Sequence, residues 1–404
     1  MLMESSTKEV ETRSLVHVER IESVTPIPNA DRIELVQVLG WQCIVKKGEL
    51  RVEDKCIYIE IDSIVPDWPV FEFLRERKFR VRTIKLRGQV SQGLCLPITP
   101  ELLEAAGLKA GEISVGMDVT EAFKVRKYDP QGDKEEASRL REEALEANRR
   151  NNKWPITFWL LKFSWFRWIY FKFVKGKERF PWPKWIVKTD ETRIQAAPVR
   201  YLGTKDTCYT SEKLDGQSCT LFITKGKRFW DKVDYGVCSR NFRVAPGSSG
   251  SWPKIYERYE TQMRKAFALE FPEGFAVQGE VIGPGIQQNK YQRKDYEFYV
   301  FNIIQPNGKR LMFHSFEDFC KRYGFTTVPV LDRAFKVNHT LPEMLEYAKG
   351  NSVLSGVTTM REGVVIRSWD QSVSFKVINN EFLLAERDEE EYEQQNKPAK
   401  EENK

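Results

Sequence analysis

Short runs of alternating hydrophobic and polar residues follow one another between residues 14 and about 98. The runs are SLVHVERIESV, DRIELVQVL, WQCIVKKG, KCIYIEID and FRVRTIKLRGQVSQGLCLPI, with turn-forming segments such as NAD and KKGE between them. Alternation with a period of two is typical of strands that bury one face. Because little helical sequence separates the runs, they predict a small β-barrel at the N-terminal end of the chain.

The segments IPNADRIELVQVLG and KLRGQVSQGL in this block resemble oligonucleotide-binding (OB) modules, including those attached to some tRNA-binding proteins. Any small Greek-key barrel is the alternative. OB barrels often present a basic strand face to oligonucleotides. The basic residues that we expect to contact phosphates are Arg80, Arg82, Lys85 and Arg87. The alternative for some of them is a place inside the barrel or an ion pair with Glu60 or Asp62.

The charge of the chain agrees with a polyanionic partner. The 404 residues carry a net charge of +6, and residues 1–385 carry +10 because the tail 386–404 holds eight acidic and four basic residues. Such a surplus suits nucleic acid, an acidic membrane surface, or solubility alone. With 404 residues, of which 41% are hydrophobic and 12% aromatic, the chain can build sizeable cores in two domains or in one large one.

The cysteines and histidines argue against a structural zinc site and against a disulfide framework. The seven cysteines are scattered without a CxxC pair, and the chain has three histidines. The N-terminal segment MLMESSTKEVETRS lacks the apolar core of a secretion signal. We therefore expect a soluble intracellular protein, either cytoplasmic or nuclear.

A charged segment and an aromatic segment lie in the middle of the chain. Residues 134–153 have a charged helical pattern, in which Glu135 is spaced to pair with Arg139. Residues 154–185 contain 13 aromatic residues. Lys162, Arg167 and Lys172 interrupt the aromatic run, and at roughly 3 kcal/mol each near a bilayer centre they would cost about 9 kcal/mol, which argues against membrane insertion. We expect packing between domains, with interfacial membrane contact or stacking on bases as alternatives.

The stretch YTSEKLDGQSCT, residues 209–220, places Lys213 two residues before an Asp215-Gly216 pair. Asp-Gly between strand-like runs is a strong hairpin signal, and a surface turn explains this stretch when it is taken alone. Further segments follow it in order: Ser239-Arg240-Asn241, Gln278-Gly279-Glu280, FYVFNI around Phe301, REGVVIR around Glu362, and SFKVI around Lys376.

Together and in this order, these segments resemble nucleotidyltransferase motifs I, Ia, III, IV and V of the covalent ligases and RNA capping enzymes. The resemblance implies that Lys213 is the nucleophile that becomes adenylylated. It also implies that Glu362 serves a metal or its waters, that Glu280 serves the ribose or a metal-bound water, that Arg240 binds a phosphate or ribose oxygen, and that Phe301 stacks on the purine. Lys376 would lie at the α-phosphate.

The chemistry requires such residues. A neutral lysine must attack the α-phosphate, so its pKa has to fall through burial, neighbouring cations or a metal. The implied cofactors are ATP and Mg²⁺ or Mn²⁺ held by carboxylates and waters. The expected catalytic residues are Lys213, Lys376 and Glu362, and the expected metal ligands are Glu280 and Glu362. The residues expected around the nucleotide are Glu212, Lys213, Arg240, Glu280, Phe301, Glu362 and Lys376.

Two positions depart from the family pattern. The third motif often reads Phe-Asp-Ile, whereas Asn302 stands in the middle here, which removes a charge. Many relatives carry a second lysine two positions after the motif V lysine, whereas Ile378 stands there in this chain. Lys376 is therefore expected to act alone on the phosphate.

An N-terminal OB module joined to a block with KTDETRIQ, SEKLDG and GEVIGPGIQQNKY resembles the ATP-dependent RNA ligases of family 5, a nick-sealing branch. Only 28 residues follow Lys376, which leaves no room for the C-terminal OB domain of DNA ligases and capping enzymes. The resemblance implies a monomer that joins 3′-hydroxyl and 5′-phosphate ends, at nicks in RNA or RNA/DNA duplexes, through lysyl-AMP. A capping-type guanylyltransferase and a non-catalytic RNA-binding protein are the alternatives.

The expected fold is α+β, with an OB-type β-barrel followed by a nucleotidyltransferase domain of antiparallel sheets flanked by helices. The expected segments are a disordered N-terminus at 1–13, the OB-like domain at 14–125, a helical and aromatic linker or insertion at 126–187, the nucleotidyltransferase domain at 188–387, and a disordered acidic tail at 388–404.

Overall fold

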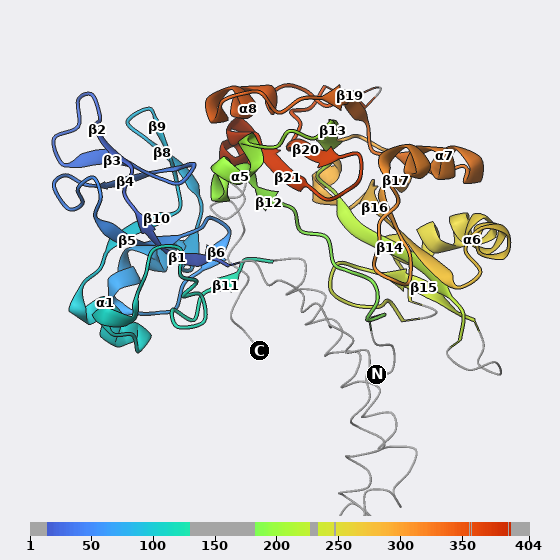
Figure 1. Cartoon of the computed structure of the whole chain (residues 1–404), viewed down its shortest axis with the longest axis horizontal. Helices are drawn as coiled ribbons and strands as arrows, with labels where there is room; N and C mark the ends of the chain where they lie inside the picture. Colours follow the sequence, from blue (N-terminus) through green and yellow to red (C-terminus); the bar gives the residue numbers. More distant parts are fainter. Residues whose placement is uncertain are drawn as a thin grey trace, which may run out of the picture.

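Two domains lie side by side in the computed structural model of the chain (Figure 1). The structure describes residues 14–129, 182–226, 233–245, 248–354, 356, 358–386 and 388. The expected N-terminal segment 1–13, the expected helix at 134–153 and nearly all of the tail 388–404 lie outside these residues. Both domains combine sheets with helices, which confirms the expected α+β class. The domain boundaries stay a prediction.

The N-terminal domain consists of short antiparallel strands, as the alternating runs predict. They form sheets in the orders β1-β5-β10, β2-β3-β4 and β11-β6-β7, together with a β8-β9 hairpin. The strands are β1 (Val16–Arg20), β2 (Ser23–Pro26), β3 (Ile33–Val38), β4 (Trp41–Lys46), β5 (Lys55–Ile59), β6 (Ser63–Ile64), β7 (Arg80–Val81), β8 (Thr83–Leu86), β9 (Gln89–Gln92), β10 (Leu94–Pro97) and β11 (Arg126–Lys127). The helices are η1 (Pro69–Arg77), α1 (Pro100–Ala106) and η2 (Ala110–Glu112).

One hydrophobic core holds this domain together. In β4 the side chains of Trp41, Cys43 and Val45 are buried, whereas the residues between them are less buried, as a period of two requires. The Trp41 ring lies 6.0 Å from the ring of Tyr58, and both side chains are fully buried. Each such side chain contributes about 1.5–3 kcal/mol, so these two aromatic residues fix the centre of the domain.

The C-terminal domain contains two five-stranded sheets, in the orders β12-β21-β20-β13-β19 and β15-β14-β16-β17-β18. The strands of the first sheet are β12 (Thr192–Arg193), β13 (Cys208–Lys213), β19 (Val330–Phe335), β20 (Gly363–Ser368) and β21 (Ser374–Ile378). The strands of the second sheet are β14 (Gln217–Thr224), β15 (Asp234–Cys238), β16 (Gly274–Ile282), β17 (Glu297–Ile304) and β18 (Thr326–Thr327).

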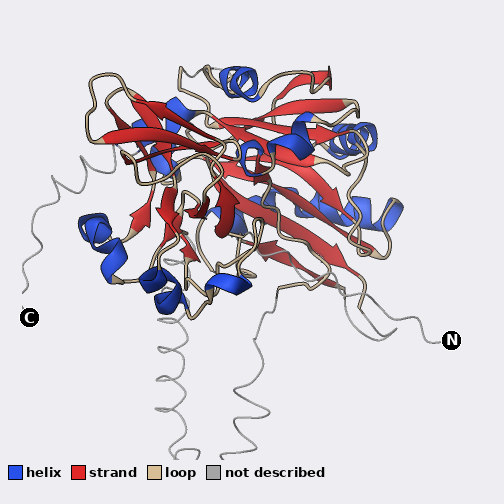
Figure 2. Ribbon diagram, turned by 60° about the vertical axis from the view of Figure 1, so that its left-hand side comes forward, coloured by secondary structure: helices blue, strands red, loops and turns tan. Residues whose placement is uncertain are grey.

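Two helices cover the second sheet. Helix α6 (Ser251–Leu269) buries Ile255, Tyr259 and Met263, which are spaced four residues apart and therefore lie on one face. These residues share a core with side chains of β14, β16 and β17 and with helix α7 (Phe313–Tyr323). Figure 2 shows helices at the outside of the sheets. Other helical segments include η3 (Ile194–Ala196), α5 (Pro198–Leu202), η4 (Gln287–Asn289) and α8 (Leu341–Tyr347).

The hairpin expected at Asp215-Gly216 is wrong. Strand β13 pairs with β19 and β20, whereas β14 pairs with β15 and β16, so the two strands that flank the turn belong to different sheets. A Cβ atom on Gly216 would lie 2.5 Å from the carbonyl oxygen of Val281. The short turn thus carries the chain from one sheet to the other at a point of close backbone approach.

The two domains touch through backbone and side-chain contacts. The Gly40 amide donates to the Gln195 carbonyl at 2.9 Å, and the Gln92 side chain donates to Asn380 at 3.1 Å. Arg193 donates to Asp62 at 2.6 Å. These contacts join the N-terminal domain to residues near the start and near the end of the C-terminal domain's sequence.

The seven cysteines are all free and buried. Residues 154–181 of the aromatic stretch lie outside the described residues, so the alternatives for that stretch stay open. At its end, Trp182 and Trp185 pack against a small core that contains Ile186 and Phe222. Within the described ranges, no helix is long and apolar enough to cross a membrane.

Gly40→Ala is expected to weaken the contact between the domains, because its Cβ would lie 2.6 Å from the Gln195 Cα atom. Overpacking of this kind costs about 1–3 kcal/mol. Differential scanning calorimetry should show a lower melting temperature or two separated transitions. Gly111→Ala is the control, because nothing lies within 4 Å of its Cβ position. Equal melting curves for both variants would show that the contact contributes no stability.

Candidate active site

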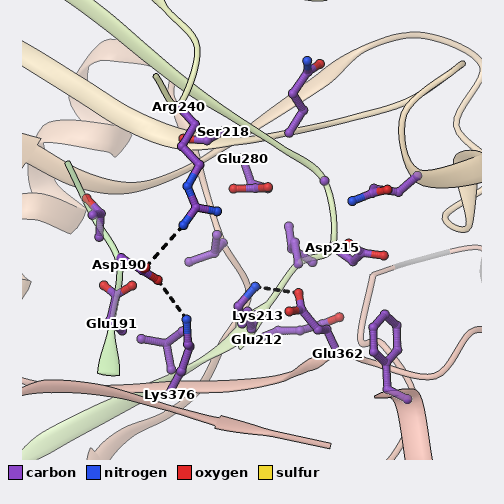
Figure 3. Close-up of a pocket in the computed structure, with 18 of the residues that line it drawn as sticks. Asp190, Glu191, Glu212, Lys213, Asp215, Ser218, Arg240, Glu280, Glu362 and Lys376 are labelled. Atoms are coloured by element: carbon purple, nitrogen blue, oxygen red, sulfur yellow. Dashed lines mark hydrogen bonds and ion pairs between the residues drawn. The ribbon is translucent and has the colours of Figure 1, made fainter. Parts of the chain in front are cut away.

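A cavity of about 830 Å³ lies where the C-terminal sheets face the N-terminal domain. Its wall includes Lys213 from β13, Glu280 from β16 and Val365 from β20, together with Asp62 and Arg80 from the N-terminal domain. Figure 3 shows both acidic and basic side chains around it. The cavity therefore combines residues that are far apart in the sequence.

Lys213 is brought to Glu362 by strand pairing. Lys213 ends β13 and lies opposite Gly363, the first residue of β20. Glu362 directly precedes Gly363, and its Oε2 accepts a hydrogen bond from Lys213 Nζ at 2.6 Å (Figure 3). A Cβ atom on Gly363 would lie 2.2 Å from the Val377 carbonyl oxygen, so glycine allows the close approach of β21.

The ionisation of this pair depends on burial and on neighbouring carboxylates. Burial lowers the pKa of Lys213, but Glu362, Glu280 and Asp215 outweigh burial and raise that pKa above its ordinary value. Burial raises the pKa of Glu280 to about 8 against the opposing effect of Lys213, and it also raises the pKa of Glu362. The protein alone therefore does not give Lys213 the low pKa that the expected chemistry needs. Lowering this pKa requires neutralisation of these carboxylates.

Asp190 joins three basic side chains at the opposite wall. Its Oδ1 accepts from Lys376 Nζ at 3.0 Å, its Oδ2 pairs with Lys127, and Arg240 Nη2 lies 3.4 Å from Oδ2 (Figure 3). Burial opposes ionisation of Asp190, but Lys376, Lys127 and Arg240 outweigh it and hold its pKa well below the usual range. Asp190 is therefore a carboxylate throughout the physiological pH range.

Asp215, from the turn after Lys213, is held by the loop that follows β16. Its carboxylate accepts from Lys290 Nζ at 2.9 Å, and its backbone amide donates to the Tyr291 hydroxyl at 2.9 Å. Gln287, Gln288 and Asn289 of this loop all have positive φ angles, which cost energy for residues other than glycine. The strained loop lines the cavity next to the candidate nucleophile.

Phe301, Val328 and Val365 form an apolar part of the wall. The guanidinium of Arg367 lies 5.4 Å from the centroid of the Phe301 ring, and Arg367 also forms a 2.6 Å ion pair with Glu191. Both partners of this ion pair are almost fully buried. An apolar surface of this kind can contact a flat aromatic ring, and stacking of Phe301 on the purine stays a prediction.

Glu212 lines the cavity, but its carboxylate is engaged elsewhere. Its Oε2 accepts a hydrogen bond from the Val353 amide at 2.9 Å. Burial raises the pKa of Glu212, and hydrogen bonds from Ser352 and Val353 oppose that effect. The Glu212 side chain thus connects β13 to the loop before β20.

The four basic residues expected on the N-terminal domain occupy different environments. Arg80 lies in the cavity wall, 3.5 Å above the Tyr128 ring and 3.8 Å from Asp62. Lys85 and Arg87 are exposed on the β8-β9 hairpin, and Arg82 is half-buried. The alternative of an ion pair with Asp62 therefore describes Arg80, whereas the hairpin residues are available to solvent.

Arg193 was not singled out from the sequence, although it lies in the KTDETRIQ segment together with Asp190 and Glu191. Its side chain is 6% exposed, and Nη2 donates to Asp62 at 2.6 Å. Its Nε and Nη1 are buried without a hydrogen-bond partner in the described parts of the chain. Buried donors are nearly always paired, so this side chain is ready to bind an anion in the cavity.

The expected metal ligands Glu280 and Glu362 both lie in the cavity. Among the described residues there is no group of three or more His, Cys, Asp and Glu that could hold a metal ion. Mg²⁺ usually takes one or two carboxylates and completes its shell with waters and substrate phosphates. Two glutamates in a cavity that also contains Lys376 and Arg240 fit that pattern.

Comparisons with known proteins agree with this geometry. A model of an OB-fold domain matches residues 15–98, and a model of the RNA ligase family matches residues 206–378. A solved structure of Naegleria gruberi RNA ligase without ligand is 28% identical, covers 93% of this chain and 99% of its own, and superposes with a TM-score of 0.72. The chain thus contains an OB-fold domain followed by an RNA ligase domain.

Two further structures of the Naegleria gruberi enzyme contain ligands. One with AMP and manganese is 28% identical, covers 92% of this chain and 98% of its own, and has a TM-score of 0.71. One with ATP and manganese is 27% identical, covers 91% and 98%, and has a TM-score of 0.69. None of the curated proteins matches the chain. The expected class, an ATP-dependent RNA ligase with an N-terminal OB domain, is confirmed, and the ligands of these relatives agree with the expected cofactors.

Glu280→Gln is expected to stabilise this RNA ligase at high pH in metal-free buffer. The folded-state pKa of Glu280, about 8, lies above its ordinary value of 4.5, so its contribution to stability is lost as the pH rises through that range. At about pH 8.5 the variant should exceed the wild type by on the order of 1 kcal/mol or more, and near pH 4.5 the two should agree.

Urea denaturation at both pH values, with a chelator present, measures this difference. Glu273→Gln is the control, because Glu273 is an exposed glutamate of the same domain. A wild-type protein and a Glu280→Gln variant with identical pH dependence would contradict the raised pKa.

Proposed function

We propose that this RNA ligase joins 3′-hydroxyl and 5′-phosphate ends, at nicks in RNA or RNA/DNA duplexes, through a lysyl-AMP intermediate on Lys213. The observation that carries the proposal is the position of Lys213. It is a lysine at a strand end that points into a large polar cavity, inside the domain that matches the RNA ligase family.

The proposed reaction has three steps. The unprotonated Lys213 amine attacks the α-phosphorus of ATP, the bond to the β-phosphate oxygen breaks, and pyrophosphate leaves. The 5′-phosphate of the RNA then attacks the same phosphorus and frees the lysine, which leaves an adenylylated 5′ end. Finally the 3′-hydroxyl attacks the 5′-phosphate phosphorus and releases AMP.

The side chains around the cavity support the same assignment of roles. Lys376 and Arg240 present cations at one wall, where they can bind phosphate oxygens. Phe301, Val328 and Val365 provide an apolar surface for the purine. Arg193 and Arg80 of the adjacent wall add charge where the outer phosphates of ATP would extend.

Glu280 and Glu362 would hold a divalent cation, together with Asp215 if Lys290 releases it. Such a cation supplies positive charge that favours neutral Lys213 and offsets charge on the phosphates. Relatives with manganese bound support this assignment. Glu362 would then exchange its contact with the Lys213 ammonium for a contact with the cation.

We propose that the enzyme acts as a monomer. All seven cysteines are free, which fits a reducing intracellular compartment.

Lys213→Ala should abolish transfer of label from α-labelled ATP to the protein, because no other side chain replaces its amine. Sealing of a pre-adenylylated 5′ end should be partly retained, since the covalent task of the lysine is then already complete. Lys225→Ala is the control, because Lys225 is exposed and pairs with Glu273 at 3.1 Å.

Labelled protein is measured after denaturing electrophoresis, with ATP and GTP compared. Label from GTP in place of ATP would indicate a capping-type guanylyltransferase. Absence of label in the wild type would indicate a binding protein, and normal labelling of Lys213→Ala would exclude this nucleophile.

The basic residues of the N-terminal domain should separate into two functions. A Lys85→Ala/Arg87→Ala variant should adenylylate Lys213 within about two-fold of wild type, but it should bind nicked duplexes more weakly, with the log-log salt slope reduced by about 2. Arg80→Ala should instead reduce adenylylation, because Arg80 lines the cavity.

Fluorescence anisotropy at several salt concentrations measures binding, and labelling with α-labelled ATP measures adenylylation. If both variants lose adenylylation equally, or if neither changes the salt slope, the division between cavity wall and hairpin is incorrect.

A further inference from the structure

Asp190 contacts the cations that the proposed function assigns to phosphate. Two of its partners, Lys376 and Arg240, come from the C-terminal domain, and the third, Lys127, comes from β11 of the N-terminal domain. A carboxylate and a phosphate group both present anionic oxygens to such donors. In this structure Asp190 therefore makes the contacts that phosphate oxygens would make with the same side chains.

The neighbouring carboxylate serves a different purpose. Glu191 is paired with Arg367, and both side chains are nearly inaccessible, at 12% and 3% exposure. Asp190 is 28% exposed, and its side chain lies at the cavity surface between cations from two domains. The Glu191 pair can therefore stay closed during the reaction, whereas the contacts of Asp190 are open to exchange with a soluble anion.

The charges explain why an exchangeable carboxylate is useful. Three cations without an anion would repel one another in a partly buried wall. With ATP present they gain several anionic oxygens, and when pyrophosphate leaves they lose those of the outer phosphates. An internal carboxylate can fill that place between substrate and product without any other ion.

We propose that Asp190 is a positioning residue that substitutes for phosphate in the empty site. It holds Lys376, Arg240 and Lys127 in place, yields these contacts to the triphosphate, and takes back the contacts that pyrophosphate releases. Since it competes with the bound anion, it weakens binding of both ATP and pyrophosphate and thereby speeds product release. This inference rests on the proposed function, in which ATP is the substrate.

The test is binding of inorganic pyrophosphate, with Mg²⁺, to the full-length Asp190→Asn protein by isothermal titration calorimetry. Asparagine keeps the size and one acceptor oxygen but removes the charge. Pyrophosphate should bind about five-fold more tightly or better than to the wild type. The KM for ATP in Lys213 labelling should fall, whereas added pyrophosphate should inhibit multiple-turnover sealing more strongly.

Asp129→Asn is the matched control, because Asp129 lies in the same cavity and its carboxylate accepts from the Asn241 amide at 3.0 Å. It removes the same charge, so an equal gain in affinity would show a general effect of charge and overturn the specific role of Asp190. Asp190→Ala should also tighten pyrophosphate binding. Weaker or unchanged pyrophosphate binding in Asp190→Asn would show a fixed anchor and would overturn the proposal.

The binding measurement also separates this inference from the proposed function. Tighter pyrophosphate binding in Asp190→Asn, without any lysyl-AMP in the wild type, would leave the competition intact and reject the ligase chemistry on Lys213. Normal lysyl-AMP with unchanged pyrophosphate affinity would retain the ligase chemistry and reject the role of Asp190.

Discussion

Compensation of buried charge is the constraint on which this structure depends. Lys213 is paired with Glu362, Asp190 with three cations, and Arg367 with Glu191, all in or beside one cavity. Removing one partner of a buried pair typically costs about 3–5 kcal/mol, because the other charge is left without water or counterion. The partners lie on different strands and, for Asp190, in different domains. The charged site can therefore form only when the whole fold is assembled.

Strand pairing explains how residues far apart in the sequence meet. Lys213 and Glu362 are 149 positions apart, but β13 and β20 are neighbours, so the two side chains touch. The same principle places Ser218 opposite Glu280 across β14 and β16. The Asp215-Gly216 turn joins the sheet of β13 and β20 to the sheet of β14 and β16. It thereby brings Glu280 and Glu362 close to the end of β13. A turn between sheets, rather than a hairpin, therefore places Lys213 in the cavity beside carboxylates from both sheets.

The sequence predicts strands and motif order better than it predicts partners. Alternation identifies the N-terminal strands because one buried face imposes a period of two. The same logic failed at Asp215-Gly216, since local turn chemistry does not show which distant strand will pair. Arg80 and Lys85 lie in one basic stretch, yet Arg80 faces the cavity and Lys85 faces solvent. Asp190 was missed for the same reason, because the role of a carboxylate depends on the cations that surround it.

In the proposed mechanism, the ionisation of Lys213 links the binding of substrate to the reactivity of the Lys213 amine. Without ligands, nearby carboxylates raise the pKa of Lys213, so the amine is held as an ammonium that cannot attack phosphorus. Carboxylates are also the ligands that divalent cations prefer, so Glu362 cannot pair fully with both a cation and the ammonium. Loss of the lysine proton is thereby coupled to occupation of the carboxylates. In the proposed mechanism, the ion pair between Lys213 and Glu362 must open before the first bond forms.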